Sequence, residues 1–355
     1  MQRLIFLWIV IPLLSLPAQA EDGIPAFQGV TLSGLIEVEA AHSEDYDGNS
    51  ESDLTVATVE LGLEAVVNDW VSGHLLFLYE EDDTDPPELD EAIISIGNLE
   101  QSPFFAEVGK MYVWGRYETN LVSDPLTLEI GELNTTALKL GVAQNGAYGW
   151  LAGFSGDTRE GWLEVDSNND IIEHSDNKKL DKFVAELGYA QESENFSYDF
   201  SVGYINNMAE SGTVSDAIGY SEALQDYVGG YTAFGQINVA GFTLIGEYLG
   251  AKDAFAMSEL GFANHGAKPK AWNVELGYTF DVSGKEVVVA AAYQGTKEAL
   301  ALELPEKRFL VGVGVGILDN LSLSFEYGKD EDYDTADGGT DNSADFFTAK
   351  LAFEF

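Results

Sequence analysis

The chain has 355 residues, of which 61 are acidic and 17 basic, so its net charge at pH 7 is −44. This surplus of negative charge excludes a nucleic-acid partner, because the chain would repel phosphates, and it equally opposes docking on anionic lipid. Hydrophobic residues make up 45% of the sequence and aromatic residues 12%, which excludes a disordered chain, and the absence of cysteine excludes support by disulfides.

The first twenty residues have the pattern of a secretory signal peptide. Arg3 provides the positive start, Leu4–Leu16 is an apolar run, and Ala18-Gln19-Ala20 is a small-residue cleavage site. We expect residues 1–20 to be removed and residues 21–28 to form a short periplasmic segment before a barrel that spans residues 29–355. The alternative, an uncleaved membrane anchor, requires a longer apolar run.

After residue 28, short segments of alternating apolar and polar residues recur along the chain. Alternate residues of a strand face opposite sides of its sheet. Residues 30–40 and 55–67 thus place four glutamates on the polar face: Glu37, Glu39, Glu60 and Glu64. A soluble sandwich would bury the apolar face against a second sheet, whereas a membrane barrel would turn it to lipid and turn the polar face to a water-filled lumen.

Three features favour the barrel. Aromatic residues such as Trp272 and Tyr327 lie near the ends of apolar faces, where a membrane-interface girdle needs them. Short turns alternate with long, mostly acidic loops, and the chain ends in Phe355. We therefore predict an all-β fold: a transmembrane antiparallel barrel of about sixteen strands, with short periplasmic turns, long extracellular loops and no plug domain. The predicted loops are residues 42–53, 80–90, 114–133, 155–182, 206–228, 250–269, 295–306 and 328–344.

Motifs for enzyme or metal chemistry are missing. No Gly-x-Ser-x-Gly elbow, phosphate loop or zinc helix occurs, and the four histidines (His42, His74, His174 and His265) have no metal-ligand spacing. The acidic loop that begins at Asp330 carries Thr335 where an EF-hand requires glycine, so we interpret it as a solvated surface loop. We predict no enzyme activity, no cofactor and no metal site.

One segment, Gly109–Glu132, is unlike the other connections because it combines aromatic residues with a rare cation. We predict that it folds into the lumen and narrows the pore. Arg116 would face Asp124, Glu129 or Glu132, and the opposite charges would create an electric field across the pore. The alternative is a structural loop that packs on the barrel wall. The candidate constriction residues are Lys110, Arg116, Glu118, Asp124, Glu129, Glu132 and Lys139.

This segment also carries a resemblance. GKMYVWGRYETN followed by SDPLTLEIGE, together with the signal peptide, the long acidic chain and the terminal phenylalanine, resembles the LbtU family of siderophore porins of Gram-negative bacteria. The chain has Trp114 where that motif is expected to have proline. The resemblance implies an outer-membrane barrel of about sixteen strands without a plug that acts in uptake of a ferric siderophore.

Passive uptake of small solutes, above all a ferric siderophore or similar chelate, is therefore the expected function. The alternatives are a general cation-selective diffusion porin and a structural or adhesive surface barrel. An anionic chelate would need a positive foothold in this acidic chain, for which Lys110, Arg116 and Lys139 are the candidates. The expected partners are outer-membrane lipid, lipopolysaccharide and the barrel assembly machinery, and a homotrimer is expected only by analogy.

Overall fold

The structure is a computed structural model that describes residues 29–81, 84, 86–165, 171–175, 179–193, 195–218 and 223–355. The predicted signal peptide and the periplasmic segment 21–28 lie outside these residues, so they stay predictions. Among the helices within the described ranges, none is both long and apolar enough to cross a membrane.

Sixteen antiparallel strands form one closed barrel, which confirms the predicted fold class. The barrel closes where β1 pairs with β21, from Leu35 opposite Glu354 to Glu44 opposite Asp345. In chain order the barrel strands are β1 (Val30–Glu44), β2 (Ser50–Asn68), β3 (Val71–Tyr79), β4 (Glu88–Gly97), β5 (Phe104–Tyr112), β6 (Asn134–Gln144), β7 (Ala147–Phe154), β10 (Lys182–Ser193), β11 (Phe196–Ile205), β13 (Gly230–Val239), β14 (Phe242–Ala251), β17 (Lys270–Val282), β18 (Lys285–Lys297), β19 (Lys307–Leu318), β20 (Leu321–Glu331) and β21 (Ser343–Glu354).

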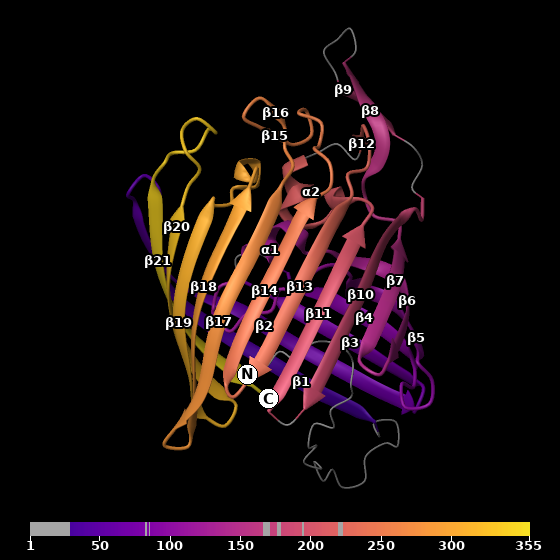
Figure 1. The fold of residues 1–355 in the computed structure, drawn as a ribbon, viewed down its shortest axis with the longest axis vertical. Coiled ribbons are helices and arrows are strands. Elements are labelled where there is room, and N and C mark those ends of the chain that lie inside the picture. Colours follow the sequence, from indigo (N-terminus) through magenta and orange to yellow (C-terminus); the bar gives the residue numbers. More distant parts are fainter. Residues whose placement is uncertain are drawn as a thin grey trace.

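The two ends of the barrel differ in the length of their connections. Short turns join the strands at one end, here the turn end, and long connections join them at the other, the loop end (Figure 1). Residues 42–53 were wrongly predicted as a long loop, because β1 and β2 stay paired as far as Glu44 and Ser50. Only residues 45–49 turn there, and the Asp45 carboxylate accepts backbone hydrogen bonds from Asp47 and Asn49.

Several long connections contain elements of their own. Residues 155–182 and 206–228 contribute β8 (Arg159–Val165), β9 (Ile171–Ser175) and β12 (Ala223–Leu224), which form a small sheet at the loop end, and 250–269 contributes β15 (Gly261–Phe262) and β16 (His265–Gly266) (Figure 1). The helical elements are α1 (Leu126–Gly131), η2 (Met208–Glu210), α2 (Gly212–Ile218) and η3 (Leu300–Leu302).

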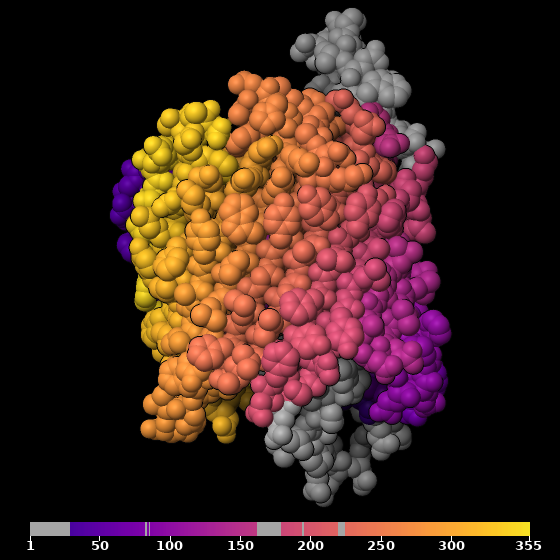
Figure 2. Space-filling view, in the orientation of Figure 1, coloured from indigo at the N-terminus to yellow at the C-terminus, as the bar shows by residue number. Residues whose placement is uncertain are grey.

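Apolar side chains cover the outer wall of the barrel. Leu32, Leu61 and Leu276 expose 56%, 40% and 52% of their surface, respectively, on strands whose neighbouring positions are polar. Figure 2 shows the outer wall on one side of the barrel as a continuous packed surface. Large exposed apolar surface is unusual for a soluble protein but is the expected outer face of a lipid-embedded barrel.

A second apolar region lies inside the barrel. Trp114, Leu126 and Ile130 pack in one buried cluster with wall residues such as Phe154 and with Met208 and Val214 of the helical connections. Part of the lumen is therefore filled by protein, and the connection between β5 and β6 contributes to this filling.

Candidate functional site

The connection between β5 and β6, residues 113–133, is called the inner segment here. Its turn uses two left-handed residues, Gly115 at φ +81° and Tyr117 at φ +56°. A Cβ on Gly115 would lie 2.0 Å from Cζ of Tyr117, so the turn requires glycine. The turn directs the chain from the end of β5 across the inner wall.

The second half of the inner segment is helical, although its residues 126–130 alternate apolar and polar. The helix α1 follows Pro125, and Leu126 and Ile130 lie one turn apart on its buried face with no exposed surface. The spacing of four between these two residues explains why a helix forms, since it places both on one side.

Arg116 points from the inner segment into the barrel wall. Its Nη2 lies 2.8 Å from Oε1 of Glu186 and 3.8 Å from Oδ2 of Asp199, and it donates to the Tyr148 hydroxyl at 2.6 Å. The Tyr148 hydroxyl in turn donates to Asp199 at 2.7 Å. These ion pairs replace the predicted pairing with Asp124, Glu129 or Glu132, so the prediction of partners was wrong.

Two further wall carboxylates bind the backbone of the inner segment. Glu247 of β14 accepts hydrogen bonds from the backbone N–H groups of Arg116 at 2.9 Å and Tyr117 at 3.2 Å, and from the Thr127 hydroxyl at 2.8 Å. Glu275 of β17 accepts from the backbone N–H of Asn120 at 2.7 Å. The Thr119 hydroxyl and the Asn120 side-chain amide also donate to Glu275, each at 2.7 Å.

The same arrangement recurs on β20. Glu326 accepts from the backbone N–H groups of Val122 at 2.8 Å and Ser123 at 3.1 Å, and from the Ser123 hydroxyl. Between β17 and β20, Gln294 of β18 accepts from the Leu126 backbone N–H at 3.1 Å. The inner segment thus runs along the wall from β7 to β20.

We call this stretch of wall the covered arc, defined by five inward carboxylates: Glu186, Asp199, Glu247, Glu275 and Glu326. Each exposes 4% of its surface or less. The sequence alone assigned no role to any of the five. The recurrence of a carboxylate on the inward face of β10, β11, β14, β17 and β20 is the signal that could have drawn attention to them.

The remaining wall is called the open arc and carries the partly exposed carboxylates Glu37, Glu39, Glu60, Glu64 and Glu91. Lys350 of β21 lies 3.1 Å from Glu37 and 4.0 Å from Glu39. His74 lies 3.5 Å from Glu91. All four glutamates predicted to face the lumen are on this arc, where acidic groups outnumber Lys350 and His74.

The two predicted lysines are engaged with nearby groups. The Lys110 ammonium donates to the backbone carbonyl of Leu89 at 2.8 Å. The Lys139 ammonium lies 2.9 Å from Glu107 and 4.9 Å from the centre of the Trp150 ring. The charge of Lys139 is therefore paired with a carboxylate, whereas the hydrogen-bond acceptor that Lys110 contacts is a neutral carbonyl.

The predicted acidic residues of the inner segment occupy different settings. Asp124 is exposed, and it follows the residues that Glu326 holds and lies near enough to Glu39 of the open arc for their charges to repel. Glu118 is partly buried near Arg116. Burial raises the pKa of Glu129, helped by repulsion from Asp124, and burial raises the pKa of Glu132 to about 7, with repulsion from Asp124 and Asp90.

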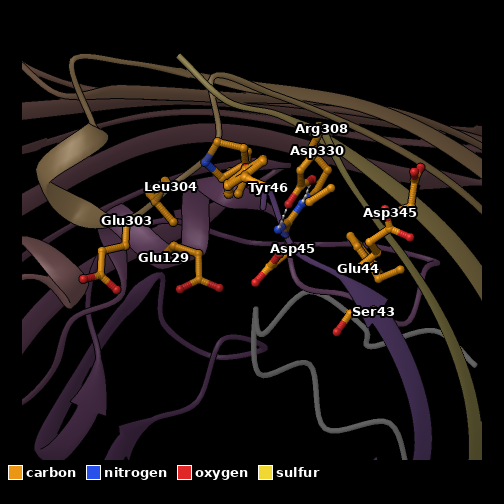
Figure 3. Close-up of a pocket in the computed structure, with 14 residues that line it drawn as sticks. Ser43, Glu44, Asp45, Tyr46, Glu129, Glu303, Leu304, Arg308, Asp330 and Asp345 are labelled. Carbon is orange, nitrogen blue, oxygen red and sulfur yellow. Dashed lines mark hydrogen bonds and ion pairs between the residues drawn. The ribbon is translucent and has the colours of Figure 1, made fainter. Parts of the chain in front are cut away.

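A cavity of about 310 Å³ opens at the loop end, between β1, β19, β20, β21 and the inner segment. Arg308 forms a bidentate ion pair with Asp330 at its wall, with both nitrogen–oxygen distances 2.8 Å. Glu129 and Asp45 extend toward the open space (Figure 3). The loop end of the lumen is therefore acidic as well, and its arginine is neutralised. Within the described ranges, no group of three His, Asp or Glu side chains is placed to hold a metal ion.

Comparison with known proteins gives distant relatives and a clear likeness of fold. No protein-family model matches the chain. It is 28% identical over 319 residues to a UPF0422 protein of Coxiella burnetii, which covers 87% of this chain and 66% of that protein. A UPF0422 protein of Legionella pneumophila is 27% identical over 380 residues, which covers 94% and 67%. The chain thus spans about two thirds of the length of the curated relatives it matches.

Two solved structures show the same barrel. The anion-selective porin from Comamonas acidovorans superposes with a TM-score of 0.61 at 14% identity, over 92% of this chain and 99% of that one. Pseudomonas putida OprB gives a TM-score of 0.61 at 10% identity, over 92% and 94%. At these identities the likeness establishes the fold alone.

Proposed function

We propose that this chain is an outer-membrane diffusion channel that prefers cations. Three observations support the proposal: the barrel is closed, its outer wall is apolar, and a segment between β5 and β6 lies along its inner wall. A polar lumen inside an apolar wall is what a water-filled membrane channel needs. The porin-like folds of the two solved structures agree with this architecture.

The charge of the open arc carries the preference for cations. Glu37, Glu39, Glu60, Glu64 and Glu91 remain partly exposed, and the exposed Asp124 of the inner segment adds a negative charge that acts on Glu39. Lys350 compensates only part of this charge. Acidic side chains on both sides of a narrow passage attract cations and repel anions. We therefore expect the opposite charge preference to that stated for the Comamonas porin.

Uptake of a ferric siderophore is the narrower function that the family resemblance implies. An anionic chelate would meet a passage whose candidate footholds are engaged: Arg116 by Glu186, Lys110 by a backbone carbonyl and Lys139 by Glu107. A neutral or cationic chelate fits the open arc better. We therefore propose cation-preferring diffusion as the general function, and a siderophore only as one solute among those it would pass.

Planar-bilayer recording of the purified barrel tests this proposal. We expect steady conductance and a reversal potential that favours cations across a potassium chloride gradient. Anion preference, or no conductance, would contradict the proposal. Addition of iron chelates of different charge distinguishes the narrower function, because a specific solute should block the current saturably, whereas a general channel should show no block.

A further inference from the structure

Residues 116–123 of the inner segment, which form neither helix nor strand, are held by carboxylates of the wall. Five of its backbone N–H groups, those of residues 116, 117, 120, 122 and 123, donate to three glutamates: Glu247, Glu275 and Glu326. Buried backbone N–H groups need a partner, and carboxylate acceptors make stronger hydrogen bonds than neutral ones. The three glutamates thus supply partners that a helix or sheet would otherwise provide.

The three glutamates are inaccessible to a passing solute. Glu275 exposes 0% of its surface, Glu326 1% and Glu247 4%. Glu275 is surrounded by donors that carry no charge, namely Thr119 and the backbone and side-chain amides of Asn120. A buried carboxylate costs free energy unless hydrogen bonds compensate it. The hydrogen bonds to the segment explain why the three glutamates are buried beneath it, whereas binding of a solute does not.

Glycines of the same wall leave space for the segment. A Cβ on Gly312 of β19 would lie 2.7 Å from Cδ2 of Leu121, and a Cβ on Gly277 of β17 would lie 3.0 Å from Nδ2 of Asn120. The wall from β14 to β20 therefore combines acceptors for the backbone with room for side chains. Both features favour a single position of residues 116–123.

We infer that Glu247, Glu275 and Glu326 are positioning residues, which hold residues 116–123 of the inner segment against the wall and so fix the position of the exposed Asp124 that follows them. As a consequence, they set the width and the charge of the passage without touching the solute. This inference rests on the proposed channel function for its effect on ions, but the hydrogen bonds can be tested separately.

Hydrogen exchange of the full-length barrel in detergent measures those bonds directly. Gln in place of Glu275 keeps the shape but replaces one acceptor oxygen by an N–H₂ group that faces other donors. We expect the Glu275→Gln variant to raise the exchange rate of the amide of residue 120 at least about tenfold, because local opening becomes easier. Glu64→Gln on the open arc is the matched control, for which exchange of residues 116–123 should not change.

Single-channel recording of the same variants provides the second measurement. Glu275→Gln should change conductance and the permeability ratio although no accessible charge is lost, while the heat-induced mobility shift of the folded barrel stays that of the wild type. Thr119→Val removes one donor to Glu275 with little change in shape, and it should change the conductance and the permeability ratio in the same direction. This variant takes the place of Glu275→Gln if Glu275→Gln does not fold.

Two results would overturn the inference. The first is unchanged exchange of residues 116–123 in the Gln variants of all three glutamates. The second is faster exchange with conductance and selectivity identical to the wild type. If the wild type itself does not conduct, the channel proposal fails, and the exchange rates still decide whether the glutamates hold the segment.

Discussion

The covered and open arcs of the barrel use the same side chain for two purposes. On the covered arc, glutamates are buried and bind N–H and O–H groups of the inner segment, as Glu275 does. On the open arc, Glu37 and Glu39 retain 14% and 25% side-chain exposure and lie beside Lys350. The comparison shows that the position of a carboxylate inside the barrel, and not its presence, decides whether it is buried under the inner segment or stays partly exposed.

The largest expected effect comes from removing the one cation that the inner segment places against the covered arc. Arg116→Met would leave Glu186 and Asp199 buried without their counter-charge, which costs about 3–5 kcal/mol for such pairs. Urea unfolding of the barrel in lipid vesicles measures this loss. Adding Glu186→Gln and Asp199→Asn should restore most of the stability, and wild-type stability of Arg116→Met alone would contradict the role of the covered arc.

A second substitution tests which side chains of β2 lie on the outer wall and which face the lumen. Leu61 lies on the outer wall, and Leu61→Lys should cost about 2–4 kcal/mol near the middle of the membrane. Glu60→Lys, one residue earlier, should fold almost as well as the wild type because its side chain faces water. The same vesicle titration compares both variants, and the reverse order of stability would invert the two faces and move Glu60 out of the open arc.

A third prediction concerns pH. Because burial raises the pKa of Glu132 to about 7, this carboxyl is neutral at pH 5 and negative at pH 8.5. Cation preference should therefore increase as pH rises through 7. The pKa of Glu132 in the folded barrel lies above its ordinary value, so the folded state binds the proton more tightly than the unfolded state does. The contribution of Glu132 to the free energy of unfolding therefore falls as pH rises from about 4.5 to 7. Reversal potentials of the wild type and Glu132→Gln should differ at pH 8.5 and agree at pH 5.

The smallest effect is expected from the open arc. Glu39→Gln removes one partly exposed charge next to Lys350, where solvent screens the charge. The free-energy difference between cation and anion permeation should therefore change by about 0.2–1 kcal/mol, which is up to about fivefold in the permeability ratio. Ion selectivity should fall while hydrogen exchange of the inner segment stays constant. A change in exchange comparable to that of Glu275→Gln would erase the distinction between the arcs.

The fold could be predicted from the sequence because one local rule repeats along the chain. Segments such as 55–67 and 272–280 alternate apolar and polar residues, and this alternation specifies strands, faces and the approximate strand number without any long-range information. The same rule misplaced the start of a loop at residue 42, since alternation weakens near a strand end while pairing continues. The alternation of residues 126–130 also gave no indication of the helix that the structure shows at residues 126–131.

The candidate site was predictable only as far as its segment. Composition singled out residues 109–132, with Arg116 as a rare cation, but it offered neighbouring carboxylates as partners. The actual partners, Glu186 and Asp199, lie 70 residues or more along the chain on other strands. Sequence proximity was a poor guide here because an inward loop contacts whichever strands the barrel brings beneath it.

By itself, the sequence determined the alternation, the acidic charge and the strands, because each follows from neighbouring residues and from the preference of apolar side chains to leave water. Only the tertiary structure decided which carboxylates are buried under the inner segment and which stay partly exposed on the open arc. Barrel closure and strand register bring residues 116–123 against Glu247, Glu275 and Glu326, and those contacts arise from pairings across more than 100 residues.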